Sequence, residues 1–527
     1  MAPTEQQIIN TLEKILSHSL FHSSPKLSSF LRYIVEQTSE GRGDRLKQYT
    51  IATELFGKAE DFDPAVDPIV RMQASKLRKS LDAYYQSQPE NILVKITLPK
   101  GSYQPSFELV DDSLTVPVPI VIEDASPAIA VLPFTCLDNG VAAETLSMVN
   151  SFHQELNLAL SKFEQLTVLS SLRVDELVRS KPSLSEIKAE LNAKYLLSGT
   201  SRVVGDKIRL TVTLSETEQG RQVWSERFEC VSDESTLYQE QDRLVVLIAS
   251  KVGSAYGCIS LHEYAEVKRG GLTDLDGYQA RLCYLEYLTR MTREGLHDIR
   301  DLFERLVAGP YASDAQSLAI LSQLYCDSFM FGEVTLEQAQ EKCSLLVAKA
   351  LDYAPLNNEV LLAQAWWALL TQKPQRVAGC AERIMQLNPG STYTLGAAGW
   401  LVCLSGNFDF GLNILRQISV REDYYPSWLK LANALNAVKL GDMESALSSI
   451  ELFYFEGNPL QAILLALIYK VAQQESLAEQ HWQEALAILP NASVVAEQLL
   501  NTIFLDRELS ETLDNARLAL VTQFTEI

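Results

Sequence analysis

"DPIVRMQASKLRKSL", Asp67–Leu81, is a basic segment near the front of an acidic chain of 527 residues. The whole chain has 67 acidic residues against 45 Lys and Arg, yet residues 70–81 contain no acid and four cations, Arg71, Lys76, Arg78 and Lys79. Asp67 and Pro68 predict a helix start, because Asp is a good N-cap and Pro is favoured at the first helical position.

A helical projection of this segment separates an apolar stripe from a cationic face. At 100° per residue, the stripe contains Val70, Ala74, Leu77, Leu81 and Tyr84. The other side contains Met72, Ser75, Lys76 and Lys79, flanked by Arg71 and Arg78. The major groove of DNA admits a helix, and Lys or Arg can pair there with guanine edges or phosphates. The alternative is a cationic face that is simply solvated.

The surrounding sequence predicts helices over residues 4–17, 26–40 and 47–56, followed by an acidic loop. After the basic helix, residues 91–109 predict two short strands with a turn at Pro99-Lys100-Gly101. The predicted order is therefore three helices, the basic helix and a hairpin.

Three segments in this order resemble the OmpR/PhoB-type winged-helix family. "VRMQASKLRKSL" (70–81) resembles its recognition helix, "YTIATELFG" (49–57) the preceding helix, and "LPKGSYQPSF" (98–107) the wing hairpin. The resemblance implies that helix 67–85 lies in the major groove of DNA and that the wing near Lys100 contacts the adjacent sugar-phosphate backbone. The expected DNA-binding residues are Arg71, Ser75, Lys76, Arg78, Lys79 and Lys100. The chain departs from the family by opening with helices instead of a small sheet, and no receiver domain with a phospho-acceptor aspartate is expected.

The fold class predicted for the chain is multidomain, with α/β and all-α parts. Residues 1–110 form the winged helix, the Pro- and Asp-rich residues 111–127 a linker, 128–232 a central α/β sandwich, 233–269 a connecting helix, and 270–527 a C-terminal TPR-like α-solenoid. "AIAVLPF" (128–134) predicts a buried strand, and residues 194–231 predict an antiparallel meander with turns at Gly205 and Gly220. This central part resembles the TolB-like (FlgO-like) domain, which in CadC-like regulators and some adenylate cyclases lies between an output module and TPRs.

A repeat period near 34 residues supports the solenoid. Pro355 and Pro389 each follow a predicted helix, and Gly406 and Gly441 each lie in a predicted turn between helices. The last unit has the spacing of a tetratricopeptide repeat at Leu465, Ala466, Tyr469, Ala478, Trp482, Ala485 and Pro490. The resemblance to a TPR array covers about seven units over residues 270–525. Aromatic residues such as Trp366 and Trp400 fill the core or line the groove, and the core is favoured.

Charge and cysteine usage restrict the function further. Residues 1–110 have 13 basic and 13 acidic residues, so the net charge of −22 resides wholly in the remainder. The eight cysteines include no CxxC pair, which argues against a zinc site or disulfides and favours a reducing cytoplasm. The first residues predict no signal peptide, and no stretch predicts a membrane span.

No enzyme class is indicated. The chain has no P-loop, no GxGxxG after a strand, no HExxH and no GxSxG, and no segment remains for a cyclase domain. His18 and His22 have i,i+4 spacing without a third ligand, so no metal and no cofactor are expected. The sequence therefore predicts a cytoplasmic DNA-binding transcription regulator. Its expected partners are double-stranded DNA and a protein or peptide at the TPR groove, with no membrane, and a homodimer is left open. The alternative is a TPR scaffold whose winged helix contacts protein.

Overall fold

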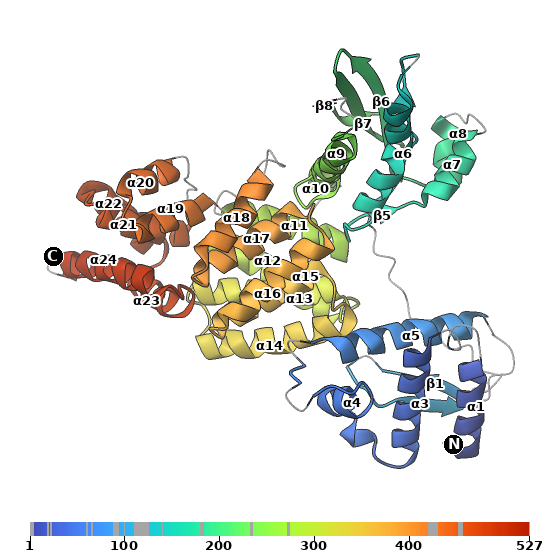
Figure 1. Ribbon diagram of the computed structural model, residues 1–527. Helices are drawn as coiled ribbons and strands as arrows, with labels where there is room; N and C mark the ends of the chain where they lie inside the picture. Colours follow the sequence, from blue (N-terminus) through green and yellow to red (C-terminus); the bar gives the residue numbers. More distant parts are fainter. Residues whose placement is uncertain are drawn as a thin grey trace. The chain divides into compact units, whose positions relative to one another are not determined.

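The structure is a computed structural model in which the described residues are 5–17, 21, 24–59, 62–64, 67–87, 94–99, 101–109, 126–139, 141–179, 184–231, 235–270, 275–419, 430–451 and 457–525. Figure 1 shows the elements in sequence colours. The predicted linker 111–127 lies almost wholly outside these residues, as do Lys100, His18 and His22.

The N-terminal elements follow the predicted order. They are α1 (Glu5–Ser17), α3 (Pro25–Ser39), η1 (Gly43–Arg45), α4 (Gln48–Glu54), α5 (Ile69–Ser87), β1 (Val94–Thr97) and β2 (Ser106–Leu109). β1 and β2 form an antiparallel hairpin, and Gly101 has a φ of +83° in its turn. One hydrophobic cluster, with Phe30, Leu77 and Ile96 fully buried, joins the helices to the hairpin and contains only residues of this segment. The segment therefore has a core of its own.

α5 is built as its sequence predicts. Asp67 Oδ1 accepts the backbone N–H of Ile69 at 3.0 Å, which caps the helix start, and Lys58 pairs with Asp67 Oδ2 at 2.7 Å. The predicted stripe, Val70, Ala74, Leu77, Leu81 and Tyr84, is buried throughout. The periodicity of the sequence is thus sufficient to orient this helix on its core.

The central domain is one mixed sheet with helices on both faces. Its strands are β3 (Ala128–Val131), β4 (Thr135–Cys136), β5 (Thr167–Val168), β6 (Tyr195–Val204), β7 (Lys207–Glu216) and β8 (Gln222–Val231). The order is β5-β3-β6-β7-β8, with β4 also on β6. β3 is parallel to β5 and β6, whereas β6, β7 and β8 form the predicted antiparallel meander.

The helices of this domain are α6 (Ala143–Leu160), α7 (Ser171–Arg179), α8 (Leu184–Leu191), α9 (Leu237–Gly253) and α10 (Cys258–Gly270). α6 and α9 contribute Phe152, Leu156, Leu244 and Ile248 to the main core. α7 and α8 cover Ala130 and Leu196 in a second cluster. Alternate residues of β3 therefore face different clusters.

The segment predicted as one connecting helix, residues 233–269, is different in the structure. It forms two helices, α9 and α10, and α9 belongs to the central core. Gly257 N donates to Ser254 O at 2.9 Å in the tight turn between them. The prediction of a single connector is wrong because the apolar face of this segment completes the sheet domain.

The same segment also has the length and composition of a membrane span. Within the described residues, Leu237–Gly270 has an 18-residue window of mean hydropathy 1.7, and 67% of that window is buried inside the protein. The sequence pattern predicts no such segment. Burial of Leu244, Ile248 and Val252 in the sheet domain accounts for the apolar run as a core helix.

Paired helices make up the rest of the chain. They are α11 (Gly277–Arg290), α12 (Arg293–Ala308), α13 (Ala315–Met330), α14 (Leu336–Tyr353), α15 (Asn358–Leu370), α16 (Pro374–Leu387), α17 (Thr392–Leu404), α18 (Phe408–Ser419), α19 (Leu431–Lys439), α20 (Met443–Glu451), α21 (Pro459–Val471), α22 (Glu475–Ile488), α23 (Ala492–Thr502) and α24 (Arg507–Thr525). In the described residues these helices make seven consecutive pairs, the number that the repeat pattern predicts.

A left-handed residue recurs in the turn between the two helices of a pair. The positions with positive φ are Met291, Gly332, Gln372, Gly406, Gly441 and Gln473. Such a residue ends the first helix and reverses the chain, and glycine adopts the conformation without steric cost. Gly406 and Gly441 are predicted turn positions, whereas Met291, Gln372 and Gln473 give no glycine signal.

The last helices of the solenoid contact earlier ones. Leu505 N donates to Leu404 O at 2.8 Å, and Gln372 Nε2 donates to Asn501 O at 3.1 Å. Lys439 Nζ lies 2.7 Å from Asp506 Oδ2. These contacts join turns that an open repeat array would keep apart, so this part of the solenoid closes on itself.

Candidate functional site

The outward face of α5 contains two lysines without acidic partners. Lys76 and Lys79 are exposed, and neither forms a hydrogen bond or ion pair with any residue that the structure describes. Ser75 is half-buried beside them. This face can therefore supply two cations and a hydroxyl to an anionic ligand.

Arg78 has a different environment from the one that the sequence predicts. Its Nε donates to Leu98 O at 3.0 Å, and its Nη2 donates to Pro99 O and Ser102 O, both at 3.1 Å. Burial lowers the pKa of the Arg78 guanidinium below its ordinary value. Arg78 thus ties α5 to the hairpin turn, and its guanidinium is committed to backbone carbonyls.

Arg71 also faces the protein. Its side chain is buried, and its Nη1 donates to Gln48 Oε1 at 3.4 Å, which links α5 to α4. The periodicity places Arg71 on the flank of the stripe but gives no sign of this partner. Of the six predicted DNA-binding residues, the structure brings Ser75, Lys76 and Lys79 together on one open face, while Lys100 lies outside the described residues.

Two further contacts fix the hairpin against α5. Tyr85 OH donates to Ile96 O at 3.1 Å and accepts the Ile96 N–H at 2.8 Å, and burial raises the pKa of Tyr85. Thr97 and Ser106 hydroxyls lie 2.6 Å apart across the strands. The hairpin is therefore held at a defined position relative to the outward face of α5 that contains Lys76 and Lys79, which we call the lysine face.

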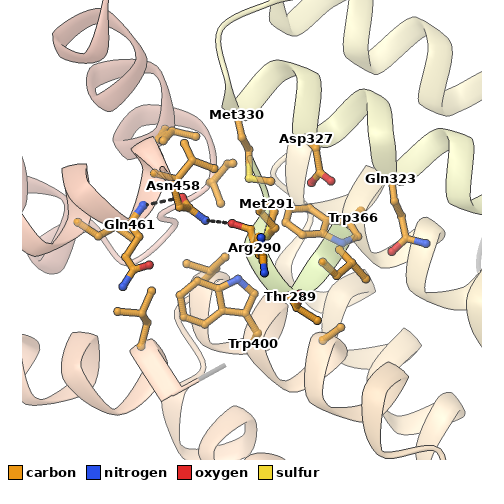
Figure 2. Close-up of a pocket in the computed structure, with 18 of the residues that line it drawn as sticks. Thr289, Arg290, Met291, Gln323, Asp327, Met330, Trp366, Trp400, Asn458 and Gln461 are labelled. Atoms are coloured by element: carbon orange, nitrogen blue, oxygen red, sulfur yellow. Dashed lines mark hydrogen bonds between the residues drawn. The ribbon is translucent and has the colours of Figure 1, made fainter. Parts of the chain in front are cut away.

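A second candidate site is a pocket within the solenoid (Figure 2), for which the sequence predicts a groove but not the acidic residue Asp327. Its helical lining comes from the first helices of successive pairs: α11, α13, α15, α17, α19, α21 and α23. The cavity volume is about 100 Å³. Aromatic and apolar side chains dominate, including Tyr284, Trp366, Tyr393, Trp400 and Phe504.

Trp366 and Trp400 are expected from the sequence to fill the core in preference to the groove. Each is 8% exposed, and both line the pocket. A tryptophan can be both buried and part of the pocket wall here, because the first helices of successive pairs pack closely around the cavity. Helix periodicity cannot distinguish these roles.

Asp327 is the acidic residue among the pocket-lining residues. It is 4% exposed, and Tyr287 OH donates to its Oδ2 at 3.0 Å. Burial raises the pKa of Asp327 to about 7, against the opposing effect of the Tyr287 hydrogen bond. Figure 2 shows the Asp327 carboxyl group and the Trp366 indole on the same side of the cavity.

The described parts of the chain contain no metal-ligand set, because no group of three or more His, Cys, Asp or Glu is placed there to hold an ion. Cys326 and Cys343 lie with Sγ atoms 3.5 Å apart, but both are fully buried. The described functional features are thus the lysine face and the solenoid pocket.

Comparison with solved structures gives low identities. TolB from Acinetobacter baumannii is 15% identical over 24% of this chain and 27% of its own, with a TM-score of 0.18. The LpoB C-terminal domain from Salmonella enterica is 15% identical over 20% of this chain and 83% of its own, with a TM-score of 0.16. The APC/C hetero-tetramer Cut9–Hcn1 is 13% identical over 98% of this chain and 83% of its own, with a TM-score of 0.36.

No curated protein matches the chain. This chain spans about a quarter of the TolB chain that it matches. One protein family does match a defined segment, which contains the sheet domain and most of α9. Residues 125–247 are similar to the second domain of the HilA/YgeH-like transcriptional regulators.

Proposed function

We propose that this chain is a transcription regulator, which binds double-stranded DNA through an N-terminal winged helix and receives a protein or peptide signal on its solenoid. The observation that carries the proposal is the face of α5, where Lys76 and Lys79 are exposed and lack acidic partners in the described structure. DNA phosphates are the chemical complement of such a face, and the size of the helix suits a major groove.

The family match supports the regulatory part of this proposal. Residues 125–247 follow the N-terminal segment and the predicted linker in the sequence, and they resemble a domain of transcription regulators. DNA binding is then local, because the remaining chain carries the whole excess of acid. We place the protein in the cytoplasm and assign it no catalytic activity.

Because the guanidinium of Arg78 is bound to backbone carbonyls, we assign the direct DNA contacts to other residues of α5. Ser75 and Lys76 are assigned to base edges, and Lys79 to phosphate. Arg78 acts on DNA indirectly, by holding the hairpin turn through the carbonyls of Leu98, Pro99 and Ser102. The proposed protein or peptide partner rests on the TPR resemblance of the repeats, and a homodimer is left open.

The test is selection of duplex DNA from a random pool by the full-length protein, followed by affinity measurements on the selected and a scrambled site at two salt concentrations. Lys79→Ala should weaken both sites alike and lower the salt slope by about one. Lys76→Ala should cost about 1–3 kcal/mol on the selected site and relax specificity at one position.

The matched control removes the same charge elsewhere. Lys162 and Lys268 are exposed in the central part of the chain. The double variant Lys162→Ala/Lys268→Ala should retain the selectivity of the parent, whereas Lys76→Ala/Lys79→Ala should lose it. If both double variants bind like the parent, α5 does not read DNA. The scaffold with a protein-binding winged helix then becomes the better description.

A further inference from the structure

The solenoid pocket has the chemistry of a site for a small organic cation. Its buried carboxyl group, Asp327, uses one oxygen to accept the Tyr287 hydroxyl. The other oxygen, Oδ1, has no hydrogen-bond or ion-pair partner among the residues that the structure describes. Burying an ionised carboxylate without a counter-charge is costly. A positive ligand in the pocket would supply that counter-charge.

The other polar groups of this wall are already engaged with one another. Tyr284 OH lies 3.5 Å from both Gln323 Oε1 and Tyr393 OH. At the opposite wall, Asn458 Oδ1 accepts the Gln461 N–H, and Asn458 Nδ2 donates to Arg290 O. These contacts leave Asp327 as the acidic group available to a ligand. Arg290, a cation in the lining, is exposed and forms no ion pair with Asp327 in the described structure.

The pocket walls favour a cation over a neutral apolar group of the same size. Trp366, Trp400, Tyr284 and Tyr393 surround the cavity, and aromatic faces attract alkylammonium ions through the ring quadrupole. Figure 2 shows the Trp366 indole next to Asp327 and the Trp400 indole on the other side of Arg290. The cavity volume of about 100 Å³ is well below the ~300 Å³ at which drug-sized pockets begin, so the ligand is small.

We propose that this pocket binds a small monovalent organic ammonium ion, with the alkylated nitrogen between Trp366 and Trp400 and its charge facing Asp327. The site is independent of DNA binding, since every lining residue belongs to the solenoid. It adds an effector class to the proposed regulator and makes no use of α5.

The test uses choline and its neutral isostere 3,3-dimethylbutan-1-ol, which have the same shape and differ in charge. Equilibrium dialysis of the full-length protein at pH 8 measures the affinity of each. Choline should bind at least about tenfold more tightly, the effect of one desolvated cation–π contact together with one ion pair. Equal affinity for the two compounds would show an apolar cavity without charge selectivity and would overturn the proposal.

Two matched pairs of variants locate the site. Asp327→Asn keeps the size of the side chain and should weaken choline binding about tenfold or more. Asp298→Asn, an exposed carboxylate on α12, should leave it unchanged. Trp366→Leu should weaken choline binding, whereas Trp367→Leu, one residue away and outside the pocket lining, should not.

Circular dichroism of each variant establishes that it is folded before its affinity is compared. Choline binding that is unchanged in Asp327→Asn would place the cation elsewhere and overturn the assignment. The variant Lys76→Ala/Lys79→Ala, designed to lose DNA, should bind choline as the parent does. Loss of DNA binding and loss of ammonium binding are therefore separate results.

Discussion

Asn458 Nδ2 donates a hydrogen bond of 3.1 Å to the backbone carbonyl of Arg290, 168 residues away in the sequence. The same side chain caps α21, because its Oδ1 accepts the Gln461 N–H at 3.0 Å. One buried amide thus joins the end of α11 to the start of α21 and closes one side of the pocket (Figure 2).

Replacing Asn458 with Asp separates these two roles. The carboxylate retains the acceptor for the Gln461 N–H but cannot donate to Arg290 O. Losing this part-buried hydrogen bond should lower the free energy of unfolding by about 0.5–1.5 kcal/mol. Denaturant unfolding followed by tryptophan fluorescence measures this loss. An unchanged midpoint and slope would show that the closure contributes no stability.

Arg78 and Lys79 are neighbours on α5 with different expected effects on stability. Arg78→Ala removes three hydrogen bonds from the hairpin turn and should cost about 2 kcal/mol. Lys79→Ala should change stability by no more than about 0.5 kcal/mol, as at most surface sites. Hydrogen exchange of peptides from residues 94–109 should be faster in the first variant alone. Equal exchange rates in the Arg78 and Lys79 variants would contradict the anchoring role of Arg78.

Separating the N-terminal segment from the acidic remainder should strengthen DNA binding at low salt. Residues 1–110 have a self-contained core and no net charge, and the rest of the chain holds 32 bases and 54 acids. Repulsion of phosphates by that remainder extends about one Debye length, ~30 Å at 0.01 M salt and ~8 Å at 0.15 M. The fragment should therefore bind more tightly than the full chain at 0.01 M, with the difference shrinking as salt is added. Equal affinities at low salt would contradict this expectation.

Substitutions at two of the positive-φ turn positions between paired helices should change stability in opposite directions. Gly441 has a φ of +73°, and a methyl group on its Cα would have no neighbouring atom within 4 Å, so Gly441→Ala adds backbone strain without a clash. It should cost about 1–2 kcal/mol. Gln473 has a φ of +58°, and Gln473→Gly should relieve strain, with a smaller gain because glycine loses more entropy on folding. The measurement is the melting temperature of each variant relative to the parent. A shift of both melting temperatures in the same direction would contradict this expectation.

The raised pKa of Asp327 predicts a pH dependence of stability. Its pKa is about 7 in the folded chain, through burial, against about 3.9 in an unfolded one. Between these values the folded state holds a proton that the unfolded state has lost. This contribution is fully present below about pH 4, and it declines as the pH rises to 7.

The variant Asp327→Asn removes that decline. The parent should lose on the order of 4 kcal/mol more than the variant between pH 4 and 8, and the difference between their curves isolates this one group. Burial also raises the pKa of the neighbouring Tyr287 and Cys326, so neither titrates in this range. Parallel curves for parent and variant would mean that Asp327 is not buried as described.

Local patterns in the sequence are sufficient to predict most elements. The stripe from Val70 to Tyr84 orients α5, and the alternation in residues 194–231 predicts the meander with its order and pairing. These predictions succeed because hydrophobic periodicity reports directly on which face is buried. The short helix α7, residues 171–179, and the break between α9 and α10 are not predicted.

The functional details depend on contacts between distant residues, which periodicity does not encode. Periodicity places Arg78 on the flank of the helix and the resemblance implies that it contacts DNA, whereas the structure shows its guanidinium bound to the carbonyls of Leu98, Pro99 and Ser102, twenty or more residues away. The pocket around Asp327 is assembled from seven helices, and nothing in the pattern of any one of them signals it. The helical turns at Gln372 and Gln473 lack glycine, so the repeats that contain them give weaker signals.

The contacts of α23 and α24 with earlier turns also bear on how this array can evolve and unfold. In an open array each repeat touches only its neighbours, so units can be gained, lost or melted from one end. Here, adding or deleting one helix pair would displace Leu505 from Leu404 and Asn458 from Arg290. These contacts between distant repeats should therefore restrict changes in the number of helix pairs, and we expect the repeats that they join to unfold in a single cooperative step.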